Sequence, residues 1–362
     1  MVEDVRRVLV LRVGDVNPNL GVRALARGSH DLISRLWPDA EFAYADFGQR
    51  PAQLPWGRAR SLVRERISGK LGMMNWLARF DLVWDTRSGD SFTDIYGLGR
   101  LSVMSAVHEF ARQAGTPVAM APQTIGPFRT AAGRLLARRA LLRSSLVFAR
   151  DPRSAAAAAE LGRPVDATVT DLVFGITQPV PATPRDILFN VSGLLWQPNP
   201  HLDNMVYQQS VRSILDNLID AGRRVTVFPH VLDSQNRDND VPTTLKLVKE
   251  YRGSIDHYVA ADLEDARSAI SAGRLMIGAR MHACLNALST GVPTVAMAYS
   301  RKFQPLLDAL EWPHVVDMRT PGEVDAVLAA VNDPALATGA VSTRDRAQEL
   351  LVRALPLLRR LT

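Results

Sequence analysis

The sequence contains a single cysteine, Cys284, among its 362 residues. One thiol excludes an internal disulfide and any zinc site built from several cysteines. Long apolar runs are also missing, because no stretch approaches the roughly 20 residues that cross a bilayer. The early apolar run at 8–13 is interrupted by Arg12 and does not fit a signal peptide. We therefore expect a cytoplasmic protein, and a core position for Cys284.

Lysine is scarce, since only four lysines accompany 39 arginines. Arginine supplies planar forks that grip carboxylate or phosphate in a bidentate way. Residues 1–178 carry 24 basic and 17 acidic side chains, a net charge of +7, whereas the remainder carries 19 and 20. A basic half suits a phosphorylated substrate or an anionic membrane surface. The lack of an aromatic–basic module and of a basic tail argues against nucleic acid.

Strand-like apolar runs alternate with helical periodicity along the chain, which predicts parallel sheets with crossover helices. A proline-rich stretch at 179–184 divides the pattern into two series. The strands are expected at 8–13, 42–47, 81–85, 117–122 and 146–150, and then at 187–192, 224–230, 275–279 and 293–297. We expect an α/β protein with two doubly wound, Rossmann-like domains facing across a cleft. Their predicted bounds are 1–178 and 185–340, followed by a C-terminal helix at 341–362 that either returns to the first domain or pairs two chains.

Residues 57–80 form a basic segment with six basic side chains and one acid, Glu65. Apolar residues recur in it at helical spacing and predict one amphipathic helix: Val63, Ile67, Leu71, Met74 and Leu77. Such a helix can lie on an anionic membrane and bring the protein to a lipid-linked substrate. The favoured alternative is a crossover helix packed on its own sheet with a solvated outer face.

Five polar stretches follow predicted strands, at the edge where open α/β sheets bind their ligands. They lie at 14–25, 85–97, 121–128, 149–154 and 278–303. In the last of these, Arg280 and His282 fall between a strand end and a helix start. Free backbone N–H groups and the helix dipole favour an anion there.

In this order and spacing, the five stretches resemble the polysaccharide pyruvyl transferase family over roughly residues 8–312. The resemblance is strongest in SGDSFTDIYG, APQTIGPF, ARD and the segment 278–303, which fits the family signature GxRxHxxxxA…GvP…Y…K. It implies a glycosyltransferase-B-like (GT-B-like) fold and phosphoenolpyruvate as donor. It also implies transfer of pyruvate to two sugar hydroxyls as a ketal, release of phosphate, and no cofactor or metal. The first domain would face the acceptor, a sugar or glycan in free or lipid-linked form, and the second would face the donor.

The candidate donor-site residues are those able to hold a carboxylate and a phosphate close together. Arg150 and Arg280 each offer a bidentate fork, and Lys302 adds a point charge. His282 titrates near neutrality and is the first candidate for general acid or base, with Asp90 as the second. Each has a structural alternative: Arg280 pairing with Asp262 or Asp308, for example, and Arg150 pairing with Asp151 or Asp171. The candidate acceptor contacts are Asn19, Gln123 and His230.

Two other functions stay open on the sequence alone. A GT-B glycosyltransferase using a nucleotide sugar would share the architecture, but the segment 282–291 lacks the acidic residue that often holds the ribose. A non-catalytic scaffold of polysaccharide assembly would be expected to lose Arg280 or His282, and both are present.

Overall fold

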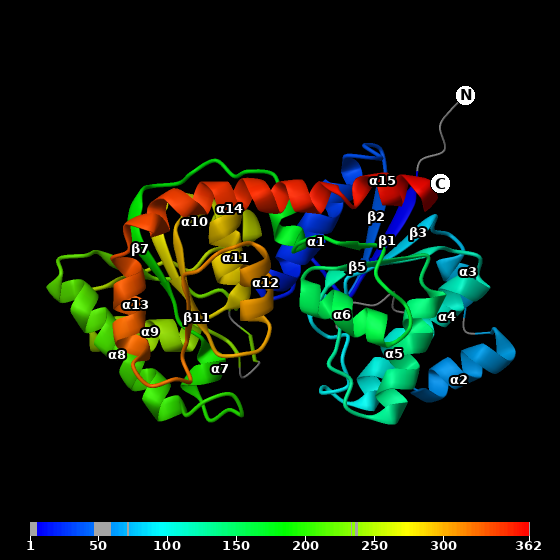
Figure 1. The fold of residues 1–362 in the computed structure, drawn as a ribbon, viewed down its shortest axis with the longest axis horizontal. Helices are drawn as coiled ribbons and strands as arrows, with labels where there is room; N and C mark the ends of the chain where they lie inside the picture. Colours follow the sequence, from blue (N-terminus) through cyan, green and yellow to red (C-terminus); the bar gives the residue numbers. More distant parts are fainter. Residues whose placement is uncertain (1–5, 47–58, 71, 233, 236–237, 362) are drawn as a thin grey trace. The chain divides into compact units, whose positions relative to one another are not determined.

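The computed structural model describes residues 6–46, 59–70, 72–232, 234–235 and 238–361. They belong to two compact units, which are treated separately below (Figure 1). Unit 1 comprises Met1–Asp15, Leu25–Gly175 and Glu349–Thr362, and unit 2 comprises Val16–Ala24 and Ile176–Gln348. Each unit holds one six-stranded sheet whose strand pairings are all parallel. The predicted α/β architecture with two Rossmann-like sheets is confirmed.

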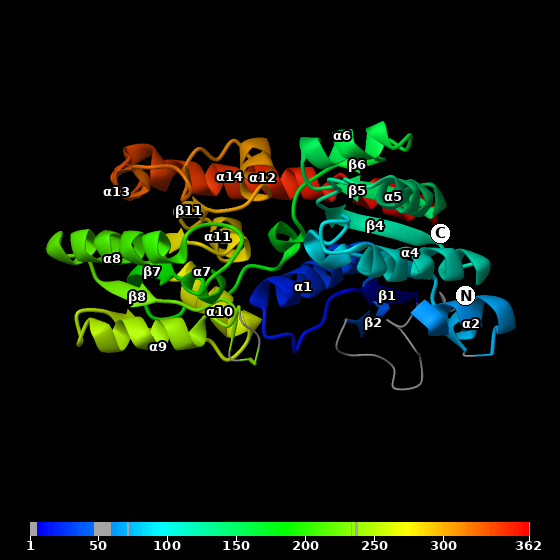
Figure 2. The ribbon, with the colours of Figure 1, turned by 90° about the horizontal axis from the view of Figure 1, so that it is seen from below.

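Unit 1 has the strand order β2-β1-β3-β4-β5-β6. The strands are β1 (Arg7–Leu11), β2 (Glu41–Ala45), β3 (Leu82–Asp85), β4 (Val118–Gln123), β5 (Leu146–Ala149) and β6 (Ala167–Thr168). The helices of this part of the chain are α1 (Leu20–Ser34), α2 (Ala59–Ser68), α3 (Met73–Leu77), α4 (Leu98–Gln113), α5 (Ala131–Arg143) and α6 (Pro152–Glu160), with short 3-10 turns η1 (Arg87–Gly89) and η2 (Leu172–Gly175). Figure 2 shows α2, α4 and α5 side by side, and both neighbouring pairs, α2 with α4 and α4 with α5, are in contact.

Unit 2 has the order β12-β11-β10-β7-β8-β9. Its strands are β7 (Arg185–Asn190), β8 (Val225–Val227), β9 (Asp256–His257), β10 (Gly273–Gly278), β11 (Thr294–Ala298) and β12 (Val315–Asp317). The remaining helices are α7 (Gly193–Trp196), α8 (Asn204–Asp220), α9 (Val241–Glu250), α10 (Leu263–Ser271), α11 (Met281–Ser289), α12 (Phe303–Ala309), α13 (Glu323–Val331), α14 (Pro334–Val352) and α15 (Leu355–Leu358), with the 3-10 turn η3 (Arg359–Leu361).

Both strand orders reverse once, and the reversal marks the expected ligand position. In doubly wound sheets a crevice opens beyond the carboxyl ends of the two strands that flank the reversal. The flanking strands are β1 and β3 in unit 1, and β7 and β10 in unit 2. The strands themselves are thoroughly buried, as in β1, where Val8, Leu9 and Val10 have no exposed surface. Such continuous apolar runs are typical of sheets covered on both faces.

Local sequence signals explain where several helices begin. Asp151 caps α6 by accepting a hydrogen bond of 2.8 Å from the backbone N–H of Ser154, with Pro152 at the first helical position. Asp followed by Pro is therefore a local sequence signal for the start of α6. α11 ends at Ser289, and Gly291 follows with φ +79°, a conformation that favours glycine.

The basic segment 57–80 differs from its prediction, because it forms two helices rather than one. Gly69 and Gly72, with φ of +60° and +77°, separate α2 from α3. The predicted apolar stripe is buried only in part, since its members Val63 and Ile67 are 59% and 82% exposed. Leu77 of the stripe packs into the core of unit 1 together with Leu62 and Met73 from outside it, and Met74 of the stripe is partly buried against that core. Residues 57–58 and Leu71 lie outside the described part of the chain.

The end of the chain, Glu349–Thr362, packs with unit 1. Leu351 reaches within 3.0 Å of the place where a Cβ on Gly175 would lie, so the segment is closely packed there. Of the predicted C-terminal helix at 341–362, the part from Glu349 onward therefore groups with unit 1, and the pairing of two chains through this segment stays a prediction. Within the described residues, no single helix has the length and hydropathy to span a bilayer, and only the sharply bent pair of α13 with the helices after it meets those criteria.

Candidate functional site

The start of α11 lies at the strand reversal of unit 2, directly after β10. Asn190, the last residue of β7, accepts a hydrogen bond of 2.9 Å on its side-chain oxygen from the backbone N–H of Arg280. Its side-chain NH₂ donates to the carbonyl of Phe228 at 2.9 Å. One asparagine therefore ties together the ends of three neighbouring strands. Glycine is required at 278, because a Cβ there would lie 2.8 Å from the sulfur of Cys284.

The guanidinium of Arg280 is held by a buried carboxylate, Asp240. Nη2 lies 2.7 Å from Asp240 Oδ1, Nε lies 3.1 Å from the same oxygen, and Nη2 also donates to the carbonyl of Asp238. Burial lowers the pKa of Arg280, but the charge and hydrogen bond of Asp240, together with the charges of Tyr299 and Asp238, outweigh burial and raise this pKa above its usual value. Nη1 has no hydrogen-bond partner among the described residues, and the side chain is 11% exposed. Arg280 is thus an oriented cation at the start of α11, and its Nη1 makes no hydrogen bond to the described residues.

Asp240 also fixes the surrounding loops. Its carboxylate accepts backbone N–H bonds from Gly193 (2.8 Å), His230 (3.1 Å) and Val231 (2.9 Å). These bonds, together with the bond to Arg280, account for the complete burial of a charged residue. No local sequence pattern points to Asp240 as the partner of Arg280, since the two residues lie 40 positions apart.

His230 sits behind the start of α11 in a network that fixes its tautomer. Arg267 donates to Asn286 Oδ1 at 2.9 Å, which leaves the Asn286 NH₂ to face His230 Nε2 at 3.1 Å and the carbonyl of His282 at 2.8 Å. Nε2 of His230 must therefore accept, and its proton is on Nδ1. Burial, helped by the charges of His282 and Arg280, holds the pKa of His230 well below its usual value. His230 is a neutral hydrogen-bonding group, not a proton carrier near pH 7.

His282 lies in the first turn of α11 and faces the first turn of α1. A Cβ on Gly21 would lie 2.8 Å from the His282 ring. Asn19 caps that turn of α1, its side-chain oxygen accepting from the N–H of Gly21 at 2.9 Å. Leu20 donates its N–H to the carbonyl of His230 at 3.1 Å. Unit 2 therefore brings together four predicted site residues: Asn19, His230, Arg280 and His282.

Lys302 stands on the neighbouring element, as the residue before α12. The strand that leads to it, β11, pairs directly with β10. Burial and then the charge of Lys302 lower the pKa of His201. Lys302 is half-buried at the same edge of the sheet as Arg280.

The other three predicted residues, Asp90, Gln123 and Arg150, gather at the carboxyl edge of the sheet in unit 1. Thr124 donates its N–H to the carbonyl of Gly89 at 2.8 Å, and Arg150 donates its N–H to that of Gln123 at 3.3 Å. The side chain of Gln123 is fully buried, and neither of its amide atoms has a hydrogen-bond partner in the described part of the chain. Asp90 is half-buried and accepts from the Tyr96 hydroxyl at 3.3 Å.

Arg150 is fully buried and already bound within unit 1. Its Nη1 lies 2.8 Å from Asp171 and its Nε donates to the Thr124 hydroxyl at 3.0 Å. The pairing with Asp171 is one of the two structural alternatives that the sequence left open. For Arg280, by contrast, the observed partner is Asp240, and neither Asp262 nor Asp308 was the right choice.

A buried charge cluster that the sequence did not single out lies at the strand reversal of unit 1. Asp85 contacts Arg87 Nε at 2.9 Å and His108 Nε2 at 2.7 Å, and all three side chains are fully buried. Nearby Arg12 is also buried, and burial lowers its pKa to about 10. Arg12 and Arg87 have φ of +67° and +49°, an uncommon backbone conformation for residues with side chains. The only sequence signal was the polar character of the stretch at 85–97. The described residues contain no group of three or more His, Cys, Asp or Glu side chains placed to hold a metal ion.

Solved structures of the same fold include proteins in complex with UDP or with a UDP-sugar. MnaA of S. aureus, solved with UDP, matches with a TM-score of 0.62 and 11% identity over 99% of this chain and 98% of that one. UDP-GlcNAc 2-epimerase of Neisseria meningitidis, bound to UDP-GlcNAc, matches at 0.56 and 13% over 97% and 99%. Alr3699/HepE of Anabaena, in complex with UDP-glucose, matches at 0.54 and 13% over 97% of both chains. These identities establish the fold alone, the two-domain GT-B class.

The sequence narrows the class further. A model of the family described as polysaccharide pyruvyl transferase matches residues 74–301. That range covers well over half of the chain and includes both Arg150 and the Arg280–His282 motif. The chain belongs to the polysaccharide pyruvyl transferase family. A search of curated proteins by sequence finds no match.

Proposed function

We propose that the protein transfers pyruvate from phosphoenolpyruvate to two hydroxyls of a sugar, forming a cyclic ketal and releasing phosphate. Membership of the family supports this activity. The single observation that carries it is the arrangement of Arg280, which Asp240 holds at the start of α11 with no partner for Nη1 among the described residues, two positions before His282 in the chain. The product belongs to polysaccharide biosynthesis of the cell envelope.

The donor site is built around the start of α11. Arg280 Nη1 binds one acidic group of phosphoenolpyruvate, while the N-terminal backbone N–H groups of this nine-residue helix favour the same negative charge. Lys302, at the same sheet edge, supplies a second cation. Arg150 is proposed as the contribution of unit 1, and in that role it binds the donor while its Nη1 remains paired with Asp171.

The chemistry requires one proton donor and one acceptor. His282 protonates the methylene carbon of phosphoenolpyruvate, and the first sugar hydroxyl adds to the neighbouring carbon and gives its proton back to the imidazole. The bond from that carbon to the phosphate oxygen then breaks, phosphate leaves, and the second hydroxyl closes the ketal as its proton is removed. Asp90 is the second candidate for this last proton, and Asn19, Gln123 and His230 are proposed to contact the acceptor. Acid–base help of this kind contributes about 10²–10⁴-fold in rate.

The test is phosphate release from phosphoenolpyruvate, measured across a panel of acceptor glycans. The unmodified chain is expected to release phosphate with at least one acceptor, and His282→Asn is expected to lower kcat by about 10²–10⁴-fold. His257→Gln, an exposed histidine of β9 in the same unit, is the matched control and should change little. Equal activity of His282→Asn and the unmodified chain would exclude the role given to His282.

A nucleotide-sugar transferase is the second candidate, because structures of this fold have been solved with UDP and UDP-glucose. Against it stands α11, whose sequence MHACLNALS holds no acidic side chain for a ribose. A thermal-shift assay separates the two functions. Protection by phosphoenolpyruvate without nucleotide supports the ketal transferase, whereas protection by UDP alone, without phosphate release from phosphoenolpyruvate, supports the nucleotide-sugar enzyme.

A further inference from the structure

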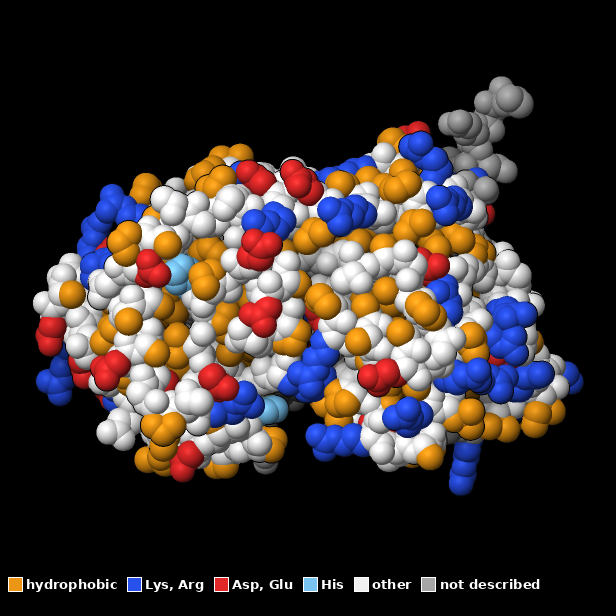
Figure 3. Space-filling view, viewed as in Figure 1, with side chains coloured by type: hydrophobic (Ala, Val, Ile, Leu, Met, Phe, Trp, Pro, Cys, Tyr) orange, Lys and Arg blue, Asp and Glu red, His pale blue; other side chains and the backbone are white. Residues whose placement is uncertain are grey.

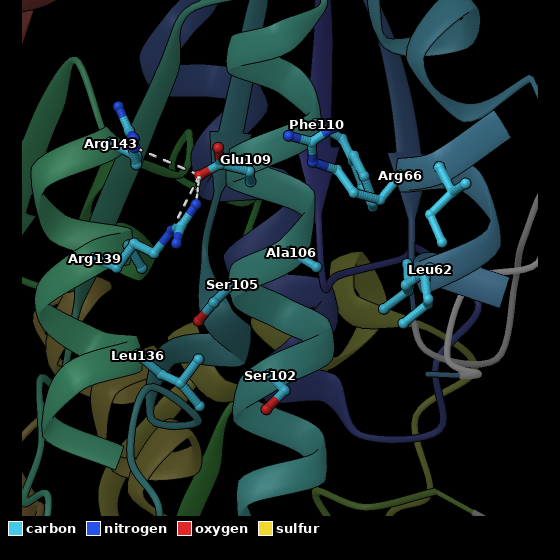
Figure 4. A pocket seen from close by; sticks show the side chains of 13 residues that line it. Leu62, Arg66, Ser102, Ser105, Ala106, Glu109, Phe110, Leu136, Arg139 and Arg143 are labelled. Carbon is cyan, nitrogen blue, oxygen red and sulfur yellow. Dashed lines mark hydrogen bonds and ion pairs between the residues drawn. The ribbon is translucent and has the colours of Figure 1, made fainter. Parts of the chain in front are cut away.

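A groove on unit 1 lies outside the region that holds the proposed site residues. It has a volume of about 350 Å³ and runs over α4 between α2 and α5 (Figure 4). This volume is in the range of small-molecule pockets, about 300–1,000 Å³. Its walls are mainly apolar: Leu62, Val63, Ile67, Ala106, Phe110 and Leu136.

One end of the groove is basic. Figure 4 shows Arg139 and Arg143 on α5 beside Glu109 of α4, with Arg66 of α2 across from them. Arg139 and Arg143 approach Glu109 at 3.1 and 3.4 Å and stay 61% and 35% exposed. Since two guanidinium groups share one carboxylate and Arg66 adds a third cation, this end keeps a positive charge. Away from these arginines, Leu136 and Leu62 lie on either side of the groove, with the hydroxyls of Ser102 and Ser105 between them.

The helices around the groove concentrate the charge of the whole chain. α2, α4 and α5 together contain nine arginines and two glutamates, a formal charge of +7, whereas the complete chain has +6. The rest of the protein is therefore close to neutral. One of the two glutamates, Glu65, is fully buried and accepts from the backbone N–H of Met74, so it is not part of the surface around the groove.

Large apolar side chains stand exposed among these arginines. Ile67 is 82% exposed, Val63 59%, and Leu135 on α5 67%. Figure 3 shows basic and hydrophobic side chains next to one another over α2. Exposed aliphatic groups surrounded by arginines are typical of surfaces that enter the headgroup region of an anionic bilayer. Nothing in the packing of unit 1 requires Ile67 or Val63 to be apolar.

We propose that the groove and its basic rim dock the protein on an anionic phospholipid bilayer. One acyl chain occupies the apolar length of the groove, and its headgroup phosphate meets Arg66, Arg139 and Arg143. Ile67 and Val63 enter the interface beside it. Two-part recognition of this kind combines burial of apolar surface with charge attraction. Docking on the bilayer would keep the enzyme where lipid-linked sugars are held. This proposal does not depend on the chemistry proposed for unit 2.

The experiment is flotation of the full chain with vesicles, carried out without phosphoenolpyruvate. Vesicles of phosphatidylcholine alone are compared with vesicles of equal parts phosphatidylcholine and phosphatidylglycerol. Binding is expected only to the anionic vesicles and should fall as salt rises, since exposed charges are screened over about 10 Å at 0.1 M ionic strength. Failure to bind anionic vesicles at low salt would overturn the proposal, whatever the enzyme activity.

Two variants locate the binding surface. Ile67→Asp should weaken vesicle binding by at least about tenfold, because it replaces an inserted aliphatic group with a like charge to the lipid. Arg66→Ala should weaken it on the order of fivefold. Met205→Asp, at a 66% exposed position of unit 2, and Lys249→Ala on α9 are the matched controls and should bind as the unmodified chain does.

Two further results would also contradict the proposal. If Ile67→Asp and Met205→Asp bind vesicles equally well, the groove is not the docking surface. If the unmodified chain is a dimer in light scattering and Ile67→Asp makes it a monomer without changing vesicle binding, a second copy of the chain covers this face instead.

Discussion

Each unit places a buried Arg–Asp pair at the strand reversal of its sheet, yet the two arginines differ in how far they reach the surface. In unit 1, Arg87 is completely buried against Asp85. In unit 2, Arg280 is paired with Asp240 but its side chain remains 11% exposed. A buried ion pair is weak evidence for function or for stability by itself. Of these two arginines, Arg280 alone has surface that a ligand from solution can contact, in keeping with the role proposed for it.

The largest expected effect tests the carboxylate behind Arg280. Asp240→Ala leaves a buried guanidinium without its partner, which costs about 3–5 kcal/mol. We expect that loss in urea unfolding and, in the protein that remains folded, loss of thermal protection by phosphoenolpyruvate. Asp240→Asn keeps the size of the side chain and should raise the KM for phosphoenolpyruvate more than it lowers kcat, which a purely structural role would not do.

Asp262→Ala is the control for this substitution. Asp262 caps α10 in the same unit by accepting from the N–H of Asp265 at 2.9 Å, and removing a cap costs about 1 kcal/mol. If Asp240→Asn has an unchanged KM, Asp240 does not position Arg280 for the donor.

The substitution in unit 1 that corresponds to Asp240→Asn is Asp85→Asn, which tests whether the two buried carboxylates differ in function. It removes the charge that Arg87 and His108 share, and we expect a loss of about 3 kcal/mol in the free energy of unfolding. The rate per folded molecule should stay the same, because the cluster is sealed from ligands. A fall in kcat without a loss of stability would instead assign the unit 1 cluster to catalysis.

A smaller effect is expected where α1 meets the imidazole of His282. Gly21→Ala adds a methyl group within 2.8 Å of that ring, so the ring must move. Displacement of a reacting group by a fraction of an ångström should lower kcat by about tenfold. Gly99→Ala, also the second residue of its helix, meets no atom within 4 Å and should not change kcat. Equal rates for both variants would show that the ring position is not critical.

The smallest expected effect is on acid stability and concerns one buried histidine in each unit. Burial is the main reason that the pKa of His108 and that of His230 lie below the usual value. A histidine with a lowered folded pKa stabilises the fold above its unfolded pKa of about 6.5 and loses that contribution as pH falls below it. We expect the Tm to fall by about 2–4 °C per histidine as the pH drops below 6.5. His230→Gln, which keeps an acceptor for Asn286, should reduce the pH dependence, and an unchanged pH profile would contradict it.

The fold can be predicted from the sequence because long apolar strands and helix caps are local signals. Continuous apolar runs predict β1, β7 and β10, and Asp151 followed by Pro152 predicts the start of α6. β6 and β9, of two residues each, carry no such signal. The apolar spacing of the basic segment continues across Gly69 and Gly72 and therefore predicts one helix. The positive φ of these two glycines ends α2 and separates it from α3.

Only part of the candidate site can be predicted from the sequence, for a different reason. Arg280 and His282 belong to one short motif, so the sequence identifies these two residues as candidates. Their environment depends on residues that are distant in sequence: Asp240 comes from the segment before α9, Asn190 from the end of β7, and Gly21 from the start of α1. Pairing across such distances follows from the strand order and cannot be taken from spacing.

The burial of the Cys284 thiol against Gly278 allows a label to be placed at another position of the chain. Its thiol donates to the Gly278 carbonyl at 3.2 Å, and burial raises its pKa to about 12, so it should ignore maleimides in the native state. A fluorophore attached through Ile67→Cys would then be the sole label on the chain. Its emission would report directly on whether that helix leaves water for lipid.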